Sequence, residues 1–179
     1  MVDFVLPDAS GPRWLAALRL VHSDLTAVLL VEDLHPAVLA LAARAGACAA
    51  LCTVLPQATL RARLRAFLAG KLTWTPAERR WAERWWARWG EPWAGLSPRQ
   101  RAVALGIARG WSDKEIAGAL GCRPTSVRTH LGEVLRRLGL PDRVAVQEWV
   151  RRGRLDDPWM APLLDLEDPP LLGEGVLKK

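Results

Sequence analysis

The hydrophobic positions of the chain change from short continuous runs to helical spacing about halfway along it. LTAVLLV at 25–31 and ACAALCTVL at 47–55 are continuous apolar runs, as expected of strands buried on both faces. A shorter apolar segment at 3–6 is also strand-like, and each of these runs is followed by a segment with helical spacing, at 12–21, 36–45 and 56–68. This alternation predicts an α/β N-terminal domain with a short parallel sheet over residues 1–72.

A tryptophan-rich segment at 73–95 is predicted to be a linker helix. Thr75–Glu78 carries the residues of a capping box with a first-turn proline, and Gly90–Pro92 is expected to end the helix. At 100° per residue, four indoles share a face about 140° wide: Trp81, Trp85, Trp86 and Trp89. We expect this face to pack on the first domain or on a second subunit; a ligand pocket built from the indoles is the alternative.

Residues 96–152 carry the pattern of an all-α domain of four helices. Ser97–Gln100 and Ser112–Glu115 are capping boxes that open the first two helices, Pro124 opens the third, and Asp142 is placed to cap the fourth. The three-residue turn Gly121–Arg123 separates the second helix from the third. A short helix, a tight glycine turn and a longer helix form a helix-turn-helix, the geometry that places one helix in the major groove of DNA.

The formal charge of +6 is unevenly distributed along the chain. Residues 96–153 contain eleven basic and five acidic side chains, whereas residues 154–179 contain three basic and six acidic ones. The excess of positive charge therefore coincides with the helix-turn-helix pattern, as a surface for polyanions requires, although a solvated basic face would give the same count. The acidic, proline-rich stretch at 153–179 is predicted to be an extended or partly disordered tail that docks through Trp159 and Leu163–Leu164.

The third helix leaves hydroxyl and guanidinium side chains off its apolar stripe. Arginine can bind guanine through two hydrogen bonds, hydroxyls can reach bases or phosphates, and a lysine near a helix start can hold a phosphate. The candidate DNA contacts are Lys114, Arg123, Thr125, Ser126, Arg128, Thr129 and Arg136.

These residues lie in a segment that resembles the DNA-binding domain of the LuxR/NarL-type regulators. The family pattern is matched at Leu96–Arg99, Val103, Ser112, Lys114–Ala117, Leu120–Gly121, Ser126–Arg128, His130–Leu131, Arg137–Leu140 and Arg143. The resemblance implies that Lys114, Ser126, Arg128 and Thr129 face DNA. Three positions depart from the pattern: Gln100 replaces a glutamate, Arg123 a serine cap, and Gly132 a residue that is often basic.

The N-terminal part is similar to a truncated response-regulator receiver domain. Asp3 begins a segment like the phosphoacceptor strand and its loop, and Gly46-Ala47 matches a further family position. Val31 stands where the family has its switch Ser/Thr, and Cys52 or Thr53 stands in place of its lysine. Because the acidic pair that would hold Mg²⁺ is also missing, the resemblance implies a pseudo-receiver in which Asp3 aligns with the phosphoacceptor but is not phosphorylated.

The resulting prediction is a DNA-binding transcriptional regulator that acts as a homodimer and independently of phosphorylation, with RNA polymerase as a further candidate partner. A sigma-like promoter-recognition factor, and a ligand or partner sensor working through the tryptophan helix, are the alternatives. No apolar run spans a bilayer, so a cytoplasmic protein without membrane contact is expected. The three histidines lie in separate elements and no nucleophile motif accompanies them, which predicts a protein that is not an enzyme. Free thiols, no metal and no cofactor are expected.

Overall fold

The computed structural model describes residues 2–3, 11–157 and 160. The described residues divide into two compact units, one up to Arg84 and one from Trp85 onward. We call them the sheet unit and the helical unit and describe each by itself.

The sheet unit contains the predicted parallel sheet. Its strands are β1 (Val2–Asp3), β2 (Val28–Val31) and β3 (Ala49–Cys52), in the order β1-β2-β3. Both pairs are parallel, and β2 pairs with β3 from Val28 opposite Ala49 to Val31 opposite Cys52. The predicted strand–helix alternation is confirmed. β2 and β3 are each shorter than the apolar run that contains them, whereas β1 shares only Asp3 with the predicted segment at 3–6.

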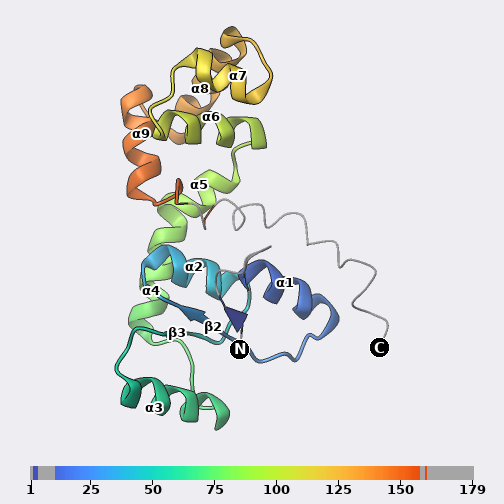
Figure 1. Cartoon of the computed structure of the whole chain (residues 1–179), viewed down its shortest axis with the longest axis vertical. Coiled ribbons are helices and arrows are strands. Elements are labelled where there is room, and N and C mark those ends of the chain that lie inside the picture. The colour runs from blue at the N-terminus through green and yellow to red at the C-terminus, as the bar shows by residue number, and fades with distance from the viewer. Residues whose placement is uncertain (1, 4–10, 158–159, 161–179) are drawn as a thin grey trace. The chain divides into compact units, whose positions relative to one another are not determined.

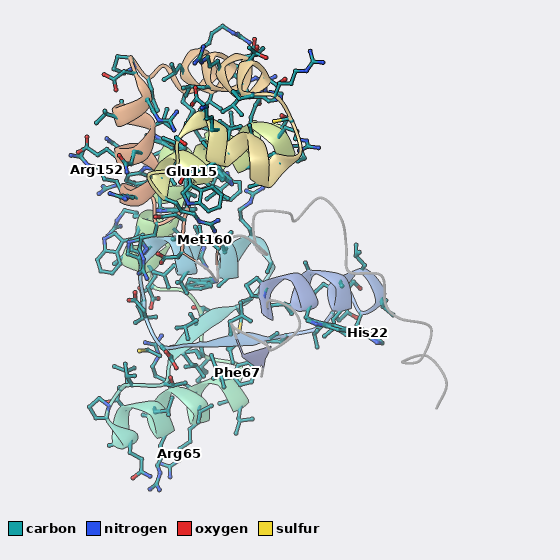
Figure 2. All side chains as sticks on the ribbon, turned by 45° about the horizontal axis from the view of Figure 1, so that its top comes forward. His22, Arg65, Phe67, Glu115, Arg152 and Met160 are labelled. Carbon is teal, nitrogen blue, oxygen red and sulfur yellow. The ribbon has the colours of Figure 1, made fainter. Side chains whose placement is uncertain are left out.

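Three helices cover the sheet: α1 (Gly11–Val21), α2 (Pro36–Arg44) and α3 (Gln57–Leu68). Figure 1 shows α1 and α2 on one side of the strands and α3 on the other. On the α3 side, the buried Val28, Ala49 and Leu51 pack with half-buried residues that include Phe67. Figure 2 shows Phe67 on the sheet side of α3 and Arg65 pointing away from the sheet. Because β2 and β3 are covered on both faces, their sequences are apolar throughout.

Gly46, after α2, meets two demands that only glycine satisfies. Its φ of +85° lies in the left-handed region, and a Cβ there would stand 2.6 Å from Arg19 Nε. Arg19 Nη1 donates to the carbonyls of Leu25 at 2.8 Å and Gly46 at 3.1 Å. The arginine therefore ties the loop before β2 to the turn before β3.

The tryptophan-rich segment is helical as predicted, but its predicted end is wrong. The capping box is present: Thr75 N–H donates to Glu78 Oε2 at 2.7 Å, and Glu78 N–H donates to Thr75 Oγ1 at 3.2 Å. Helical residues then run through α4 (Pro76–Trp85), a π-helical turn η1 (Trp86–Gly90) and α5 (Glu91–Ala94). Gly90 is itself helical, and the π turn bonds Glu91 N–H to the Trp86 carbonyl, so the chain stays helical into Pro92, which has no N–H to satisfy.

The helical unit contains the four predicted helices α6 (Pro98–Ala108), α7 (Asp113–Leu120), α8 (Pro124–Leu138) and α9 (Arg143–Arg152) (Figure 1). Both serine capping boxes form, and Asp142 accepts from Ala145 N–H at 2.8 Å. The apolar residues that recur at helical spacing make the core: Val103, Ile107, Ile116, Val127, Val134, Val146 and Val150, each at most 2% exposed.

Tryptophans close the end of this core. Trp93 is 1% exposed and stacks on Trp149 with 6.3 Å between ring centroids. Trp85 is 2% exposed and its Nε1 donates to the Gly153 carbonyl at 3.3 Å. Trp86 and Trp89 are partly buried, whereas Trp81, in the sheet unit, is 50% exposed. The predicted indole face is therefore divided, with Trp85 inside the helical unit and Trp81 at a surface.

The chain does not become extended at residue 153, as the tail prediction required. Residues 153–156 form turns, and Leu155 and Met160 are fully buried. A Cβ on Gly153 would stand 2.6 Å from Trp89 Cδ1, so this glycine allows the turn to approach the indole. Residues 158–159 and 161–179, with the predicted docking of Trp159 and Leu163–Leu164, lie outside the described residues.

Candidate nucleic-acid interface

The turn between α7 and α8 sets the helix-turn-helix geometry. Gly121 follows α7 with φ 61° and ψ 38°, a left-handed conformation that favours glycine. Cys122 N–H donates to the Ala117 carbonyl at 3.0 Å, which closes the end of the eight-residue α7. Three residues, Gly121 to Arg123, separate the end of α7 from the start of the fifteen-residue α8 at Pro124.

Helix α8 has one buried and one exposed face. At 100° per residue, five exposed positions fall within an arc of about 100°: Thr125, Arg128, Thr129, Gly132 and Arg136. Val127 and Val134 on the opposite side are fully buried. We call the exposed arc the polar face of α8. It carries two guanidinium groups, two hydroxyls and, at Gly132, a gap where a Cβ would meet nothing within 4 Å.

The structure brings four of the seven candidate contacts together on this polar face and places the other three around it. Lys114 is exposed in the first turn of α7. Arg123 is exposed at the start of α8, where its side chain makes no capping bond. Ser126 is only half exposed and lies beside the polar face. Among the described residues, neither Lys114 nor Arg123 has an ion-pair partner, which leaves both free for phosphate.

Arg128 is held by a carboxylate that the sequence analysis did not single out. Arg128 Nε donates to Asp113 Oδ2 at 3.1 Å, and Arg143 Nη1 donates to Asp113 Oδ1 at 2.7 Å. The hydrogen bond from Arg128, followed by that from Arg143, lowers the pKa of Asp113. Arg143 also donates to the Trp111 carbonyl. One carboxylate thus joins the starts of α7 and α9 to the polar face of α8, a long-range contact that no periodicity reveals.

Two other polar-face residues have partners within α8. Arg136 Nη2 pairs with Glu133 Oε2 at 2.7 Å, and this hydrogen bond lowers the pKa of Glu133. Thr129 Oγ1 donates to the Thr125 carbonyl at 3.2 Å. The Arg136 side chain remains 69% exposed, so its pair lies in water and is weak enough to be exchanged for a phosphate.

Many arginines of the helical unit serve its structure instead. Five of them donate to main-chain carbonyls at or just beyond helix ends, and we call them the arginine clamps. Arg99 reaches Leu120 at 2.8 Å, Arg101 reaches Ala94 at 2.8 Å, and Arg151 reaches Ala108 at 2.7 Å. Arg137 and Arg143 reach the carbonyls of Gly95 and Trp111. Cations are favourable at helix C-termini, and each clamp satisfies a carbonyl that the helix leaves unpaired. The sequence analysis assigned none of the five a carbonyl partner.

Two positions of the sheet unit align with the switch Ser/Thr and the lysine of receiver domains, and their described side chains carry neither a switch hydroxyl nor an amine. Val31 is buried at the end of β2. Cys52 Sγ lies 3.5 Å from the Glu32 carbonyl, and Thr53 Oγ1 donates to the Val31 carbonyl at 3.3 Å. Asp3 ends β1, but its side chain and residues 4–10 lie outside what the structure describes.

The three histidines lie far apart in the sequence: His22 follows α1, His35 precedes α2, and His130 lies in α8. His35 Nδ1 caps α2 by accepting from Ala37 N–H at 3.2 Å. Within residues 2–3, 11–157 and 160, no three His, Cys, Asp or Glu side chains are grouped as metal ligands. Over the same residues, no helix has the length and apolar character needed to cross a bilayer.

Comparisons with known proteins place the helical unit in a family. Residues 94–150 match the family model described as bacterial regulatory proteins, luxR family. The chain is 45% identical over 62 residues to the putative HTH-type transcriptional regulator Rv0890c of Mycobacterium tuberculosis, which is 34% of this chain and 7% of that relative. The chain therefore spans only a small part of this longer protein.

A second relative extends beyond this unit. The transcriptional regulatory protein UhpA of Salmonella typhimurium is 32% identical over 157 residues, covering 88% of this chain and 73% of UhpA. Among solved structures, the RcsB response regulator of Salmonella typhimurium is 18% identical, covers 83% of this chain and 73% of its own, and has a TM-score of 0.44.

Proposed function

This chain belongs to the luxR family of bacterial regulatory proteins, and we propose that it regulates transcription by binding duplex DNA through α7 and the polar face of α8. The observation that carries the proposal is the polar face itself. Two guanidinium groups and two hydroxyls lie within one arc of a helix that is packed on its other side and preceded by a tight turn. The luxR match over 94–150 favours this function over the sigma-like alternative.

The exposed residues divide into two roles. Arg128, near the middle of the first half of α8, is proposed to bind a base edge, with Thr125, Ser126 and Thr129 contacting bases or phosphates. Lys114, Arg123 and Arg136 are proposed to bind phosphates, because each is an exposed cation on the polar face or beside it. The arginine clamps are excluded from both roles, since their guanidinium groups are already bound to carbonyls.

Fluorescence anisotropy with a labelled duplex tests this function. With about 4–6 phosphate contacts per subunit, the logarithm of the binding constant should fall with the logarithm of salt concentration with a slope of about −4 to −5. Lys114→Ala should weaken binding to all sequences and reduce the slope by about 1, whereas Arg128→Ala should relax base preference. Arg152→Ala is the control, because Arg152 is exposed on α9 and pairs with Glu148 (Figure 2). Binding that does not respond to salt would refute the proposal.

We further propose that regulation does not require phosphorylation. The support is the set of residues at the receiver-aligned positions: an apolar Val31 and a Cys52–Thr53 pair whose polar atoms lie against main-chain carbonyls. Neither position offers a cation to stabilise an acyl phosphate. After treatment with acetyl phosphate, the intact mass should be unchanged. Addition of one phosphoryl group that is lost in Asp3→Ala would contradict this.

A homodimer is proposed as the DNA-binding form. The described sheet ends in two open edges, β1 and β3, and the sheet unit exposes Trp81 at 50%, Leu68 at 82% and Val54 at 73%. Trp85 lies inside the helical unit, so the tryptophan contribution is assigned to Trp81. Light scattering at micromolar concentration should give the mass of two chains, and Trp81→Ser should shift the protein toward monomer. A monomeric wild type would refute the dimer, and a dimer unaffected by Trp81→Ser would place the interface elsewhere.

A further inference from the structure

Asp113 links two arginines that differ in how firmly they are held. It is the first residue of α7, and its side chain is 23% exposed. Arg143 is 35% exposed and has a second anchor in the Trp111 carbonyl. Arg128 is 73% exposed and, within the described residues, is paired by Asp113 alone. Of the two bonds to this carboxylate, the one to Arg128 is therefore the easier to break.

The Asp113–Arg128 pair lies where a phosphate would arrive. Asp113 directly precedes Lys114, the proposed phosphate contact, and Arg128 lies on the polar face of α8. A carboxylate and a phosphate offer an arginine the same chemistry, an anionic oxygen that accepts N–H bonds. When Arg128 turns to DNA, Asp113 stays in place because Arg143 still holds its other oxygen. The lost Asp113–Arg128 attraction is then a cost set against every contact that Arg128 makes with DNA.

Whether DNA binding offsets the loss of the Asp113–Arg128 pair depends on the group that Arg128 binds on DNA. A single phosphate bond replaces one charged hydrogen bond by another and leaves the Asp113 carboxylate less well paired. A guanine edge offers two hydrogen bonds in fixed geometry, which exceeds what the exposed pair supplies. The exchange is thus favourable at a correct base and close to neutral or unfavourable elsewhere.

We propose that Asp113 is a specificity-determining residue, which holds Arg128 in the free protein and competes with DNA phosphates for it, so that sequence-independent binding is suppressed. The proposal rests on the DNA-binding function proposed above. It assigns to a carboxylate that need not touch DNA the task of raising the ratio of specific to non-specific affinity.

A double-mutant cycle tests it with Asp113→Asn, Arg128→Ala and the combined variant. Asparagine keeps an oxygen for Arg143 but removes the charge that holds Arg128. The probes are a random-sequence duplex and a duplex selected by the wild-type protein from a random pool. Asp113→Asn should bind the random duplex about three- to five-fold more tightly, with a salt slope steeper by about 1. Affinity for the selected duplex should rise less, so the specificity ratio falls.

The controls separate this local effect from a change in net charge. Glu148→Gln removes the same charge from α9, where Glu148 pairs with Arg152, and should change affinity for the random duplex less than two-fold. In the Arg128→Ala background, Asp113→Asn should also change it less than two-fold. The same gain in both backgrounds, or no gain in the wild-type background, overturns the proposal. Failure of the wild-type protein to bind either duplex instead overturns the DNA-binding function.

A second measurement needs no substitution at Asp113. In the wild-type protein, the Nε–H resonance of Arg128, assigned with Arg128→Lys, should show a hydrogen-bonded proton protected from exchange. Addition of the selected duplex should shift this resonance, while the Arg143 guanidinium signal stays in place. An Arg128 signal that is unprotected in the free protein, or unchanged in the complex, contradicts the proposal even if Asp113→Asn fails to fold.

Discussion

The two units of the chain use polar side chains in different ways. In the sheet unit, the strand ladder satisfies much of the buried main chain, and side chains such as Arg19 and Trp74 tie loops to it, with Trp74 Nε1 donating to the Ala47 carbonyl at 2.8 Å. In the helical unit the helices are short, so many end carbonyls remain unpaired, and the five arginine clamps supply donors from neighbouring helices.

This difference shows why the net charge of the helical unit overstates its surface for DNA. Of the eleven basic residues at 96–153, the five clamps are bound to carbonyls. The exposed remainder is Arg109, Lys114, Arg123, Arg128, Arg136 and Arg152. Arg109 lies over the Trp111 ring at 5.4 Å, and Arg152 is on α9, so a smaller set surrounds the polar face. A charge count locates the unit but not its interface.

The largest expected effect concerns the tryptophan that closes the helical core. Trp93→Ala should lower the free energy of unfolding of the helical unit by about 3–5 kcal/mol, because removal of the buried indole leaves a cavity beside Trp149. Trp81→Ala, at a half-exposed position, should cost less than about 1 kcal/mol. Urea unfolding with amide exchange assigned to each unit measures both. Loss of protection in the sheet unit comparable to that in the helical unit would break the comparison.

A pair of glycines sharpens the contrast within the helical unit. A Cβ on Gly106 would stand 2.7 Å from Ile116 Cγ1, so Gly106→Ala should destabilise the α6–α7 contact by about 1–3 kcal/mol. Gly132→Ala, in open space on α8, should stabilise by about 0.5–1 kcal/mol through helix propensity. Melting temperatures of opposite sign test the packing, and two shifts of the same sign would contradict it.

Substitution of an arginine clamp should have a smaller effect on stability and should leave DNA binding almost unchanged. Arg151→Ala removes donors to the Ala108 carbonyl, held by Nε at 3.1 Å and Nη2 at 2.7 Å, and should cost about 1 kcal/mol. Arg152→Ala removes only an exposed pair with Glu148 and should cost close to zero. Neither should change duplex affinity more than about two-fold. A large affinity loss in Arg151→Ala at unchanged stability would assign this clamp to the interface instead.

Lowering the pH should produce the smallest expected difference in stability between the two units. Hydrogen bonds lower the pKa of Asp113, of Glu115 through the Ser112 main chain and hydroxyl, and of Glu133 through Arg136, and all three lie in the helical unit. Because a lowered pKa stabilises the folded state above the ordinary carboxyl range near pH 4, this contribution is lost as the pH falls through and below that range. Amide exchange at decreasing pH should show the helical unit weakening there, less so in Asp113→Asn. An equal pH response of that variant would contradict the assignment to Asp113.

Local sequence rules predicted where the helices start. Features that depend on contacts between distant residues could not be predicted in this way. The serine boxes and Asp142 act within four residues, so their sequence spacing is enough to place α6, α7 and α9. The π turn depends on packing around Trp86 and Gly90, where a Cβ would lie 2.3 Å from the indole, and no spacing rule contains it. A helical wheel likewise gives Trp81 and Trp85 one face, but not that one indole is buried and the other exposed.

The candidate site was also predictable where it depends on local pattern, and not where it depends on long-range contacts. The exposed residues of α8 follow from the period of its apolar stripe, and Lys114 from the helix start and the family resemblance. The clamps and the Asp113 link join residues 7 to 43 positions apart. The sequence alone does not show whether the partner of an arginine is a carbonyl, a carboxylate or a phosphate.

Gly132 has a consequence for how this regulator can change over generations. It lies within the polar face of α8, it is exposed, and a Cβ added there meets no heavy atom within 4 Å. A substitution at this codon can therefore add a new group opposite DNA without repacking the fold, and alanine would even strengthen the helix. If α8 reads DNA as proposed, the position is an inexpensive route by which duplicated copies of the gene diverge to separate operators while keeping the same core.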